Sequence, residues 1–235
     1  MKWDFEELTR SVFNRHGSQQ AEVLGPLLNS IGRKFQIARY HSVESKRLID
    51  QYFGSDKFEN YDKATGFIFD RGNGDEEIIR FYQDAFISEA NVVAYSQAIH
   101  SAYDIIGRII IVAFNIGHLF QPRQNIYLHT VKKKLISGGL ANDVVAKIEA
   151  ALNCEPYSYL RAFVNTNKHL CLLSMAHTVE MDAEKETPFG IQINSFRYEE
   201  ELFPKKWATN FVTEDFITLS EGIVSVGNSV NDFLR

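Results

Sequence analysis

The stretch "DEEIIRFYQDAFISEANVVAYSQAIHSAYDIIGRIIIVAFN" at residues 75–115 decides the fold class. It opens with the acidic run Asp75–Glu77, and carboxylates favour the start of a helix because they complement its dipole. No proline follows before Asn115, and apolar residues recur along the whole stretch. The pattern therefore predicts one long helix.

Helical patterns also flank this stretch on both sides. Asp4 followed by Glu7 is typical of a capped helix start, and an apolar repeat runs from Pro26, which suits a first turn, to about Phe53. Three more helices are predicted downstream: a short amphipathic helix at 140–153, a helix from about Pro156 to about Lys185, and a last helix capped at Thr213.

Strand signals are confined to short segments. "IQINSFRYEEELF" at 191–203 alternates as two short strands would around Asn194–Ser195, and the Gly- and Asp-rich 54–74 predicts a loop with one short strand at 66–70. We therefore expect an all-α fold: a helical bundle with long antiparallel helices and a small C-terminal β-hairpin appendage. Without a repeat or linker, it should form a single domain over 1–235, with a core at about 75–185, N-terminal helices at 1–53, and the hairpin and last helix at 189–235.

The composition limits the classes of function. A chain of 235 residues with 45% hydrophobic content can bury a substantial core, which argues against disorder. Its net charge of −5 argues against a protein that coats DNA, so any contact with nucleic acid needs a local basic patch.

Targeting signals are not evident in the sequence. The N-terminal "MKWDFEELTRSVF" carries acidic residues where a secretion signal would be apolar, and Arg108 and Asn115 interrupt the apolar stretch at 105–120. The two cysteines, Cys154 and Cys171, match no disulfide framework or zinc site, and Cys171 is expected in the core. We therefore expect a cytoplasmic protein without a membrane partner.

Two rows of polar residues stand out in the two most apolar helical stretches. His100, Asp104 and Arg108 are spaced four residues apart, and so are Arg161, Asn165 and His169 in "YLRAFVNTNKHLCLL" at 159–173. Residues spaced in this way lie along one side of a helix. We expect the two rows to face each other, with Asp104 contacting Arg161 or His169.

Two interpretations of the rows remain open. In the structural one, Asp104 forms a buried ion pair that holds two helices in register, and loss of one partner would cost roughly 3–5 kcal/mol. In the functional one, His169 exchanges a proton near neutral pH while the planar guanidinium of Arg161 binds a phosphate.

At these residues the chain resembles the HEPN superfamily, named for higher eukaryotes and prokaryotes nucleotide-binding. The similarity rests on "HSAYD" at 100–104, Arg161, Asn165 and "NKH" at 167–169, and it covers about 75–185. It implies an all-α bundle, and many members are dimeric, metal-independent ribonucleases of toxin, CRISPR and phage-defence systems. The family signature places its Arg and His closer together than the seven residues that separate Arg161 from His169.

The resemblance implies a role for each residue. The catalytic residues would be Arg161, Asn165 and His169, and the supporting ones His100, Asp104 and Lys168. RNA would be the substrate, a homodimer the working form and an antitoxin or another defence protein a candidate partner, with neither cofactor nor metal. Because inactive members serve as dimerisation or partner- and nucleotide-binding modules, that alternative stays open.

Two weaker signals complete the candidates. "VKKKL" at 131–135 gathers Lys132, Lys133 and Lys134, which would either contact an RNA backbone or form a solvated helix end. His177 and Glu180, expected on the same helix as His169, lack further ligands at a suitable spacing, so no metal site is predicted.

Overall fold

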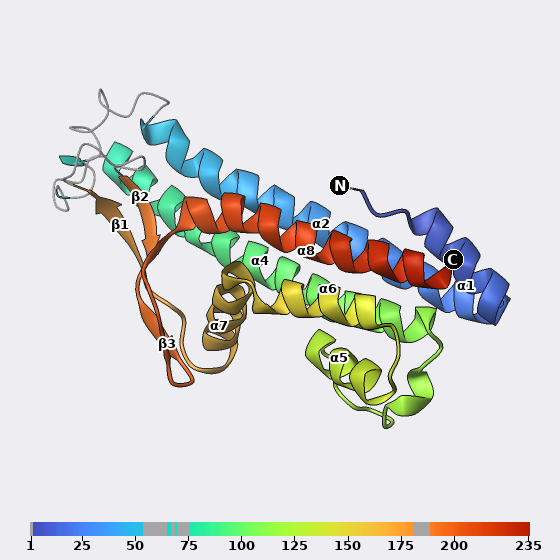
Figure 1. The fold of residues 1–235 in the computed structure, drawn as a ribbon. Helices are drawn as coiled ribbons and strands as arrows, with labels where there is room; N and C mark the ends of the chain where they lie inside the picture. Colours follow the sequence, from blue (N-terminus) through green and yellow to red (C-terminus); the bar gives the residue numbers. More distant parts are fainter. Residues whose placement is uncertain (1, 54–64, 67–68, 70–75, 181–188) are drawn as a thin grey trace. The chain divides into compact units, whose positions relative to one another are not determined.

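The computed structural model describes residues 2–53, 65–66, 69, 76–180 and 189–235, and it is mainly helical with a small antiparallel sheet region (Figure 1). The helices are α1 (Phe5–His16), α2 (Ser18–Phe53), α4 (Glu76–Ala113), η1 (Gly117–Leu119), α5 (Leu128–Ser137), α6 (Asn142–Asn153), α7 (Glu155–His169) and α8 (Ala208–Leu234). The strands are β1 (Met175–Val179), β2 (Phe189–Ile193), β3 (Phe196–Tyr198), β4 (Glu201–Phe203) and β5 (Lys206–Trp207). The expected loop at 54–74, with its strand, lies outside the described residues except for 65–66 and 69.

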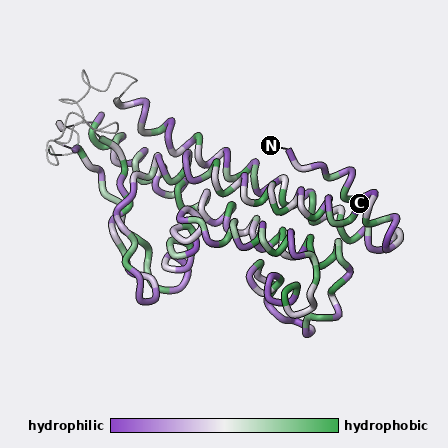
Figure 2. The backbone as a smooth tube through the Cα atoms, viewed as in Figure 1, coloured by the Kyte–Doolittle hydropathy of each residue, from purple (hydrophilic) through white to green (hydrophobic). Residues whose placement is uncertain are grey.

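The chain divides into two compact units. The first comprises 1–37, 98–160 and 217–235, and the second comprises 38–97 and 161–216. Purple and green segments alternate along the long helices in Figure 2, as expected where one face of a helix is apolar. Within the described residues, no helix is both long and apolar enough to cross a membrane.

In the first unit, α1 begins where the sequence predicts. The backbone N–H of Glu7 donates to Oδ1 of Asp4 at 2.9 Å, which satisfies one of the amides left unpaired at the helix start. The helix ends before Gly17, whose φ of 85° suits a residue without a Cβ.

The prediction that the second helix starts at Pro26 is wrong. Helix α2 begins at Ser18 and contains Pro26. The helix break that the Gly25–Pro26 pair suggests lies instead at Gly17, where φ is positive and ψ is 179°. A proline inside a helix removes one N–H···O bond and its ring crowds the carbonyl four residues earlier, so Pro26 occupies an unfavourable position in α2.

The helices at 75–115 and 140–153 are confirmed as α4 and α6. Gly107 of α4 allows close packing of α5, because a Cβ there would lie 3.4 Å from the Cα of Leu128. Helix α5 contains the basic segment "VKKKL" at 131–135, and its buried residues are Leu128, Val131 and Leu135.

In the second unit, aromatic rings fill the core. Tyr95, Phe163 and Phe211 are fully buried, and Phe211 lies 5.5 Å from the Tyr95 ring and 5.2 Å from the Phe163 ring. Within this unit, α8 therefore packs on both α4 and α7. Lys206 of β5 forms an ion pair of 2.8 Å with the buried Asp215 of α8.

The sheet region differs from the expected hairpin. Strands β1, β2 and β5 form one antiparallel sheet in that order, with Met175 opposite Ile193, while β3 and β4 form a separate two-stranded sheet. Asn194–Ser195 therefore connects strands of different sheets, and the hairpin turn lies at Glu199–Glu200 between Tyr198 and Glu201. The prediction of a pair around Asn194–Ser195 is wrong because alternation does not say which strands pair.

The helix predicted from Pro156 to Lys185 is also shorter than expected. Helix α7 ends at His169, and the residues from Met175 onward form β1. Cys171, expected in the core, is exposed as a result. The last helix begins at Ala208, so Thr213 is not its cap; the Thr213 hydroxyl donates to the carbonyl of Thr209 at 2.7 Å inside the helix.

A first prediction concerns the packing of the N-terminal segment on α8. Trp3 is buried and its indole N–H donates to Oδ1 of Asn231 at 3.2 Å, while a Cβ at Gly227 would collide with the indole ring. We expect Gly227→Ala to lower the free energy of unfolding by about 1–3 kcal/mol, because the ring must shift. Urea unfolding measures this loss.

Gly32→Ala is the matched control, since Gly32 is also helical and its added Cβ would make only an ordinary contact of 3.9 Å with the Phe5 ring. That change should stabilise by up to about 1 kcal/mol, because alanine loses less backbone entropy on folding. Equal effects of the two substitutions would contradict the assigned Trp3 contact.

Candidate functional site

Arg161 lies on the part of α7 that belongs to the second unit, and it contacts the β3–β4 hairpin. Its Nη2 is 3.6 Å from Oε2 of Glu199, and its guanidinium carbon lies 5.7 Å from the centre of the Tyr198 ring. The Arg161 side chain nevertheless keeps 44% of its surface exposed. A guanidinium held over an aromatic ring and still open to solvent can bind a phosphate or a carboxylate.

Asn165, one turn further along α7, contacts the same hairpin. Its Nδ2 donates to the hydroxyl of Tyr198 at 3.2 Å. Tyr198 therefore contacts both Arg161 and Asn165, which fixes the orientation of two of the three predicted catalytic side chains. Neither Tyr198 nor Glu199 was a candidate from the sequence, although the alternation of "SFRYEEELF" does indicate a strand there.

The hairpin presents Glu199 through a strained turn. Glu199 has a φ of 56°, in the left-handed region that side chains with a Cβ rarely adopt. The turn has two residues, Glu199 and Glu200, between the paired Tyr198 and Glu201, and tight two-residue turns require such a backbone. The conformation costs about 1–2 kcal/mol for a residue other than glycine, and the turn carries the carboxylate that contacts Arg161.

His169 and Lys168 occupy the last turn of α7, and both are exposed. Among the described residues, the His169 side chain has no hydrogen bond or ion pair. The imidazole is thus accessible to a ligand. The structure leaves it apart from Arg161, since eight helical residues at a rise of 1.5 Å separate the two by about 12 Å along the axis. One chain does not bring Arg161 and His169 to a single phosphate.

The exit of the chain after His169 depends on Asn167. Its Nδ2 donates to the carbonyl of Phe163 at 3.0 Å, and its Oδ1 accepts from the backbone N–H of Leu173 at 2.8 Å. The carbonyl of Thr166 accepts from both Leu170 and Cys171 at 3.0 Å. These bonds satisfy backbone groups left over at the helix end and turn the chain toward β1.

The predicted supporting residues on α4 are partly buried. His100 and Asp104 have intermediate exposure, and Ile99, Ala102 and Ile106 beside them are fully buried. Both belong to the first unit, whereas Arg161, Lys168 and His169 belong to the second. The expected contact of Asp104 with Arg161 or His169 stays a prediction.

The three lysines of α5 differ in their surroundings. Lys132 reaches Oε1 of Glu149 on α6 at 3.4 Å. Lys133 is exposed and Lys134 is partly buried, and neither has an ion pair within the described part of the chain. Lys133 therefore offers the most accessible positive charge of the three.

The two residues weighed for a metal site, His177 and Glu180, do not lie on the helix that carries His169. His177 lies on β1 and not on the helix of His169, with its ring 5.3 Å from that of Phe81. In the described ranges, no group of three or more His, Cys, Asp or Glu side chains could hold a metal ion.

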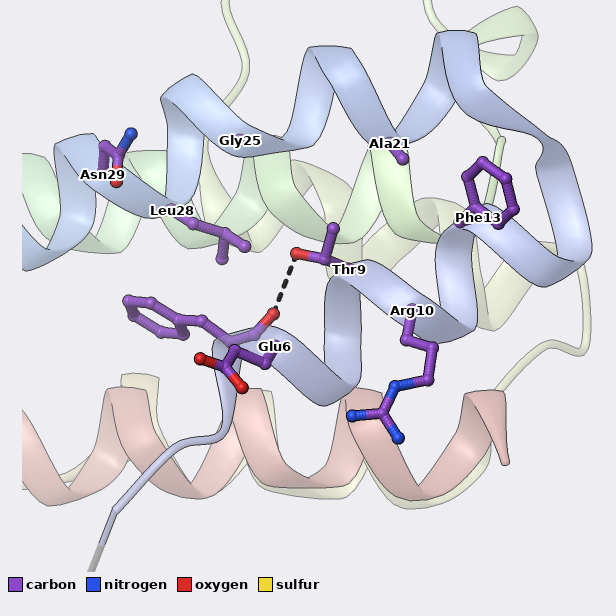
Figure 3. A pocket seen from close by; sticks show the side chains of 9 residues that line it. Glu6, Thr9, Arg10, Phe13, Ala21, Gly25, Leu28 and Asn29 are labelled. Carbon is purple, nitrogen blue, oxygen red and sulfur yellow. Dashed lines mark hydrogen bonds between the residues drawn. The ribbon is translucent and has the colours of Figure 1, made fainter.

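A groove between α1 and α2 in the first unit lies apart from these residues in the sequence (Figure 3). It has a volume of about 520 Å³ and is lined by apolar side chains such as Leu28 and Phe13, with Glu6 and Arg10 also in the lining. The Thr9 hydroxyl in it donates to the carbonyl of Phe5 at 2.9 Å. None of the predicted site residues lines this groove.

A second prediction tests whether the α7 row, which consists of Arg161, Asn165 and His169, is structural. Because Arg161 and Glu199 are 44% and 63% exposed, their ion pair should contribute less than about 1 kcal/mol. We therefore expect Arg161→Ala and His169→Ala to remain folded, with small changes in the free energy of unfolding measured by circular dichroism.

Phe163→Ala on the same helix provides the contrast, since Phe163 is fully buried and its loss should cost about 3–5 kcal/mol. If Arg161→Ala destabilised the protein as much as Phe163→Ala, the row would serve the fold.

Comparison of the chain with protein-family models, with curated proteins and with solved structures finds no match.

Proposed function

We propose that this protein is a HEPN-like, metal-independent endoribonuclease of the cytoplasm, and that the α7 row is its catalytic face. The observation that supports this best is exposure: Arg161, Lys168 and His169 are all accessible to solvent on α7. Residues kept only to pair helices would be expected to be buried against their partners. Exposed cationic and titratable side chains in one row are suited to contact a polyanion.

The proposed reaction is the attack of an RNA 2′-hydroxyl on the adjacent phosphate. The new bond joins the 2′-oxygen to phosphorus, and the bond from phosphorus to the 5′-oxygen breaks, leaving a cyclic phosphate and a free 5′-hydroxyl. Arg161 would stabilise the negative charge that grows on the phosphate. His169 would accept the proton of the 2′-hydroxyl or protonate the leaving 5′-oxygen, and water would carry out the other transfer. Asn165 would orient the phosphate, with Lys168 as a second cation.

RNA would have to replace Glu199 at Arg161. The Glu199 carboxylate lies 3.6 Å from the guanidinium and is 63% exposed. A pair with this exposure is worth at most about 1 kcal/mol, so a phosphate that also contacts other residues could displace it. The carboxylate thus marks where an anionic oxygen would bind.

The spacing of Arg161 and His169 suggests a composite site. A gap of about 12 Å along α7 is too long for both side chains to serve one phosphate. A second copy related by a two-fold axis would bring Arg161 of one chain toward His169 of the other. The proposal therefore includes a homodimer, built on the helical bundle with long antiparallel helices and on the single domain that the sequence predicts.

A second candidate is a catalytically inactive module that dimerises or binds a partner protein or nucleotide, such as an antitoxin or another component of a defence system. The contacts of the hairpin favour it, because Glu199 and Tyr198 already engage Arg161 and Asn165. In that case the α7 row would serve recognition, and no variant would change RNA turnover.

The catalytic proposal predicts RNA cleavage in EDTA. Purified protein should cleave a mixed pool of RNAs, and His169→Ala or Arg161→Ala should abolish cleavage because each removes a charge or proton carrier. Gel electrophoresis with labelled RNA measures the products. Glu200→Gln is the matched control, as it changes an exposed carboxylate beside the site without touching the row. Cleavage that persists in both alanine variants would point to another site or a contaminant.

The composite site predicts a symmetric homodimer. Light scattering at micromolar concentration should give twice the monomer mass of 26.9 kDa. If the protein is dimeric, mixing Arg161→Ala with His169→Ala chains should restore part of the activity, because one of the two sites in a mixed dimer regains both residues. A monomer at these concentrations would remove the composite site.

A further inference from the structure

A pair of stacked rings lies at the start of α5, on the first unit and outside the α7 row. The rings of Tyr127 and His129 are parallel within 7°, with their centres 5.6 Å apart. Tyr127 is 42% exposed and His129 is also exposed. The Tyr127 ring is thus accessible for stacking with a planar ligand.

The backbone that carries these rings is held in place. The carbonyl of Tyr127 accepts from the N–H groups of Thr130 and Val131 at 2.9 and 3.1 Å. The next residue, Leu128, is only 2% exposed, and its backbone packs closely against Gly107 of α4. The platform is therefore rigid, so a ligand that stacks on it would not have to order the backbone at the start of α5 first.

The same face of α5 carries positive charge. Lys133 lies four residues after His129, so the two side chains share one side of the helix. Residues 117–153 contain five lysines and arginines and two acidic residues, although the whole chain has a net charge of −5. A ring pair beside an accessible cation combines the two contacts that single-stranded nucleic acids use: stacking for bases and charge for phosphates.

Helix α2 shows why charge alone is insufficient. It also has a basic stretch, but Arg47 pairs with Glu44 at 2.8 Å and Lys46 with Asp50 at 3.9 Å on the same helix. Its exposed Tyr40 meets His41 edge to face, at 71°, instead of in a parallel stack. On α2 the cations are thus partly neutralised and the aromatic pair has no common face.

We propose that Tyr127, His129 and Lys133 form a platform for single-stranded RNA, in which an unpaired base stacks on the exposed rings and a neighbouring phosphate contacts Lys133. Bases in a duplex are already stacked on each other, so the platform selects single strands. The choice of RNA as the nucleic acid rests on the proposed function, but the platform uses none of the catalytic residues.

The test is the binding of a fluorescein-labelled twelve-nucleotide oligoadenylate RNA, followed by anisotropy in EDTA, with an RNA duplex of equal length beside it. Tyr127→Ala should weaken single-strand binding by about tenfold, since stacking on an aromatic side chain contributes that order of affinity. Tyr127→Phe should bind like the unchanged protein, because the ring remains. Duplex affinity should change little in either variant.

Tyr40→Ala is the control for loss of an exposed tyrosine, since Tyr40 is 61% exposed, and it should leave single-strand affinity unchanged. His129→Ala supplies a second variant should Tyr127→Ala unfold, and it should also weaken single-strand binding. Equal affinities of Tyr127→Ala and Tyr127→Phe, or equal losses for single strand and duplex, would overturn the platform. Single-strand binding that depends on Tyr127, without any RNA cleavage, would refute the nuclease and leave the platform standing. If Tyr127→Ala changed neither RNA cleavage nor single-strand binding, the platform would be refuted and the nuclease would stand.

Discussion

The bridge that the Asn167 side chain makes between α7 and the segment after it is the interaction on which the second unit depends. One amide group donates to Phe163 inside the helix and accepts from Leu173 beyond it. The helix therefore stops at His169 and the chain is free to enter the sheet at Met175. Had α7 continued, His169 would lie in mid-helix and β2 would lose its partner β1.

The sheet in turn supports the segment that leads to the contacts of Arg161. Strand β2 pairs with β1 on one side and β5 on the other, which anchors both ends of the segment that contains β3 and β4. The hairpin between these anchors carries Tyr198 and Glu199 to α7. An aromatic ring and a carboxylate thus hold a guanidinium that remains 44% exposed, so Arg161 is oriented without being buried. Orientation before binding reduces the entropy that a ligand must overcome.

Local signals were sufficient for part of this fold, and non-local ones decided the rest. The Asp4 cap, the proline-free run of α4 and the amphipathic repeat of α6 are encoded within a few turns of chain, and each helix forms as predicted. The end of α7 is different, because the apolar "LCLL" at 170–173 would also suit a continuing helix, and the helix ends through the bond of Leu173 to Asn167 and the pairing of Met175 with Ile193 of β2. Tyr198 and Glu199 escaped prediction for the same reason: no spacing in the sequence connects them to Arg161.

In both surfaces proposed to bind RNA, a cation lies beside an aromatic side chain, although the chain as a whole is negatively charged. At physiological salt a charge acts over only about 8 Å, so an isolated lysine attracts a polyanion weakly. An aromatic contact is not screened in this way. Arg161 lies over Tyr198, and Lys133 shares a helix face with His129, whose ring stacks on Tyr127. Under both proposals, a cation beside an aromatic ring would bind RNA through a short-range contact that the net charge of −5 opposes little.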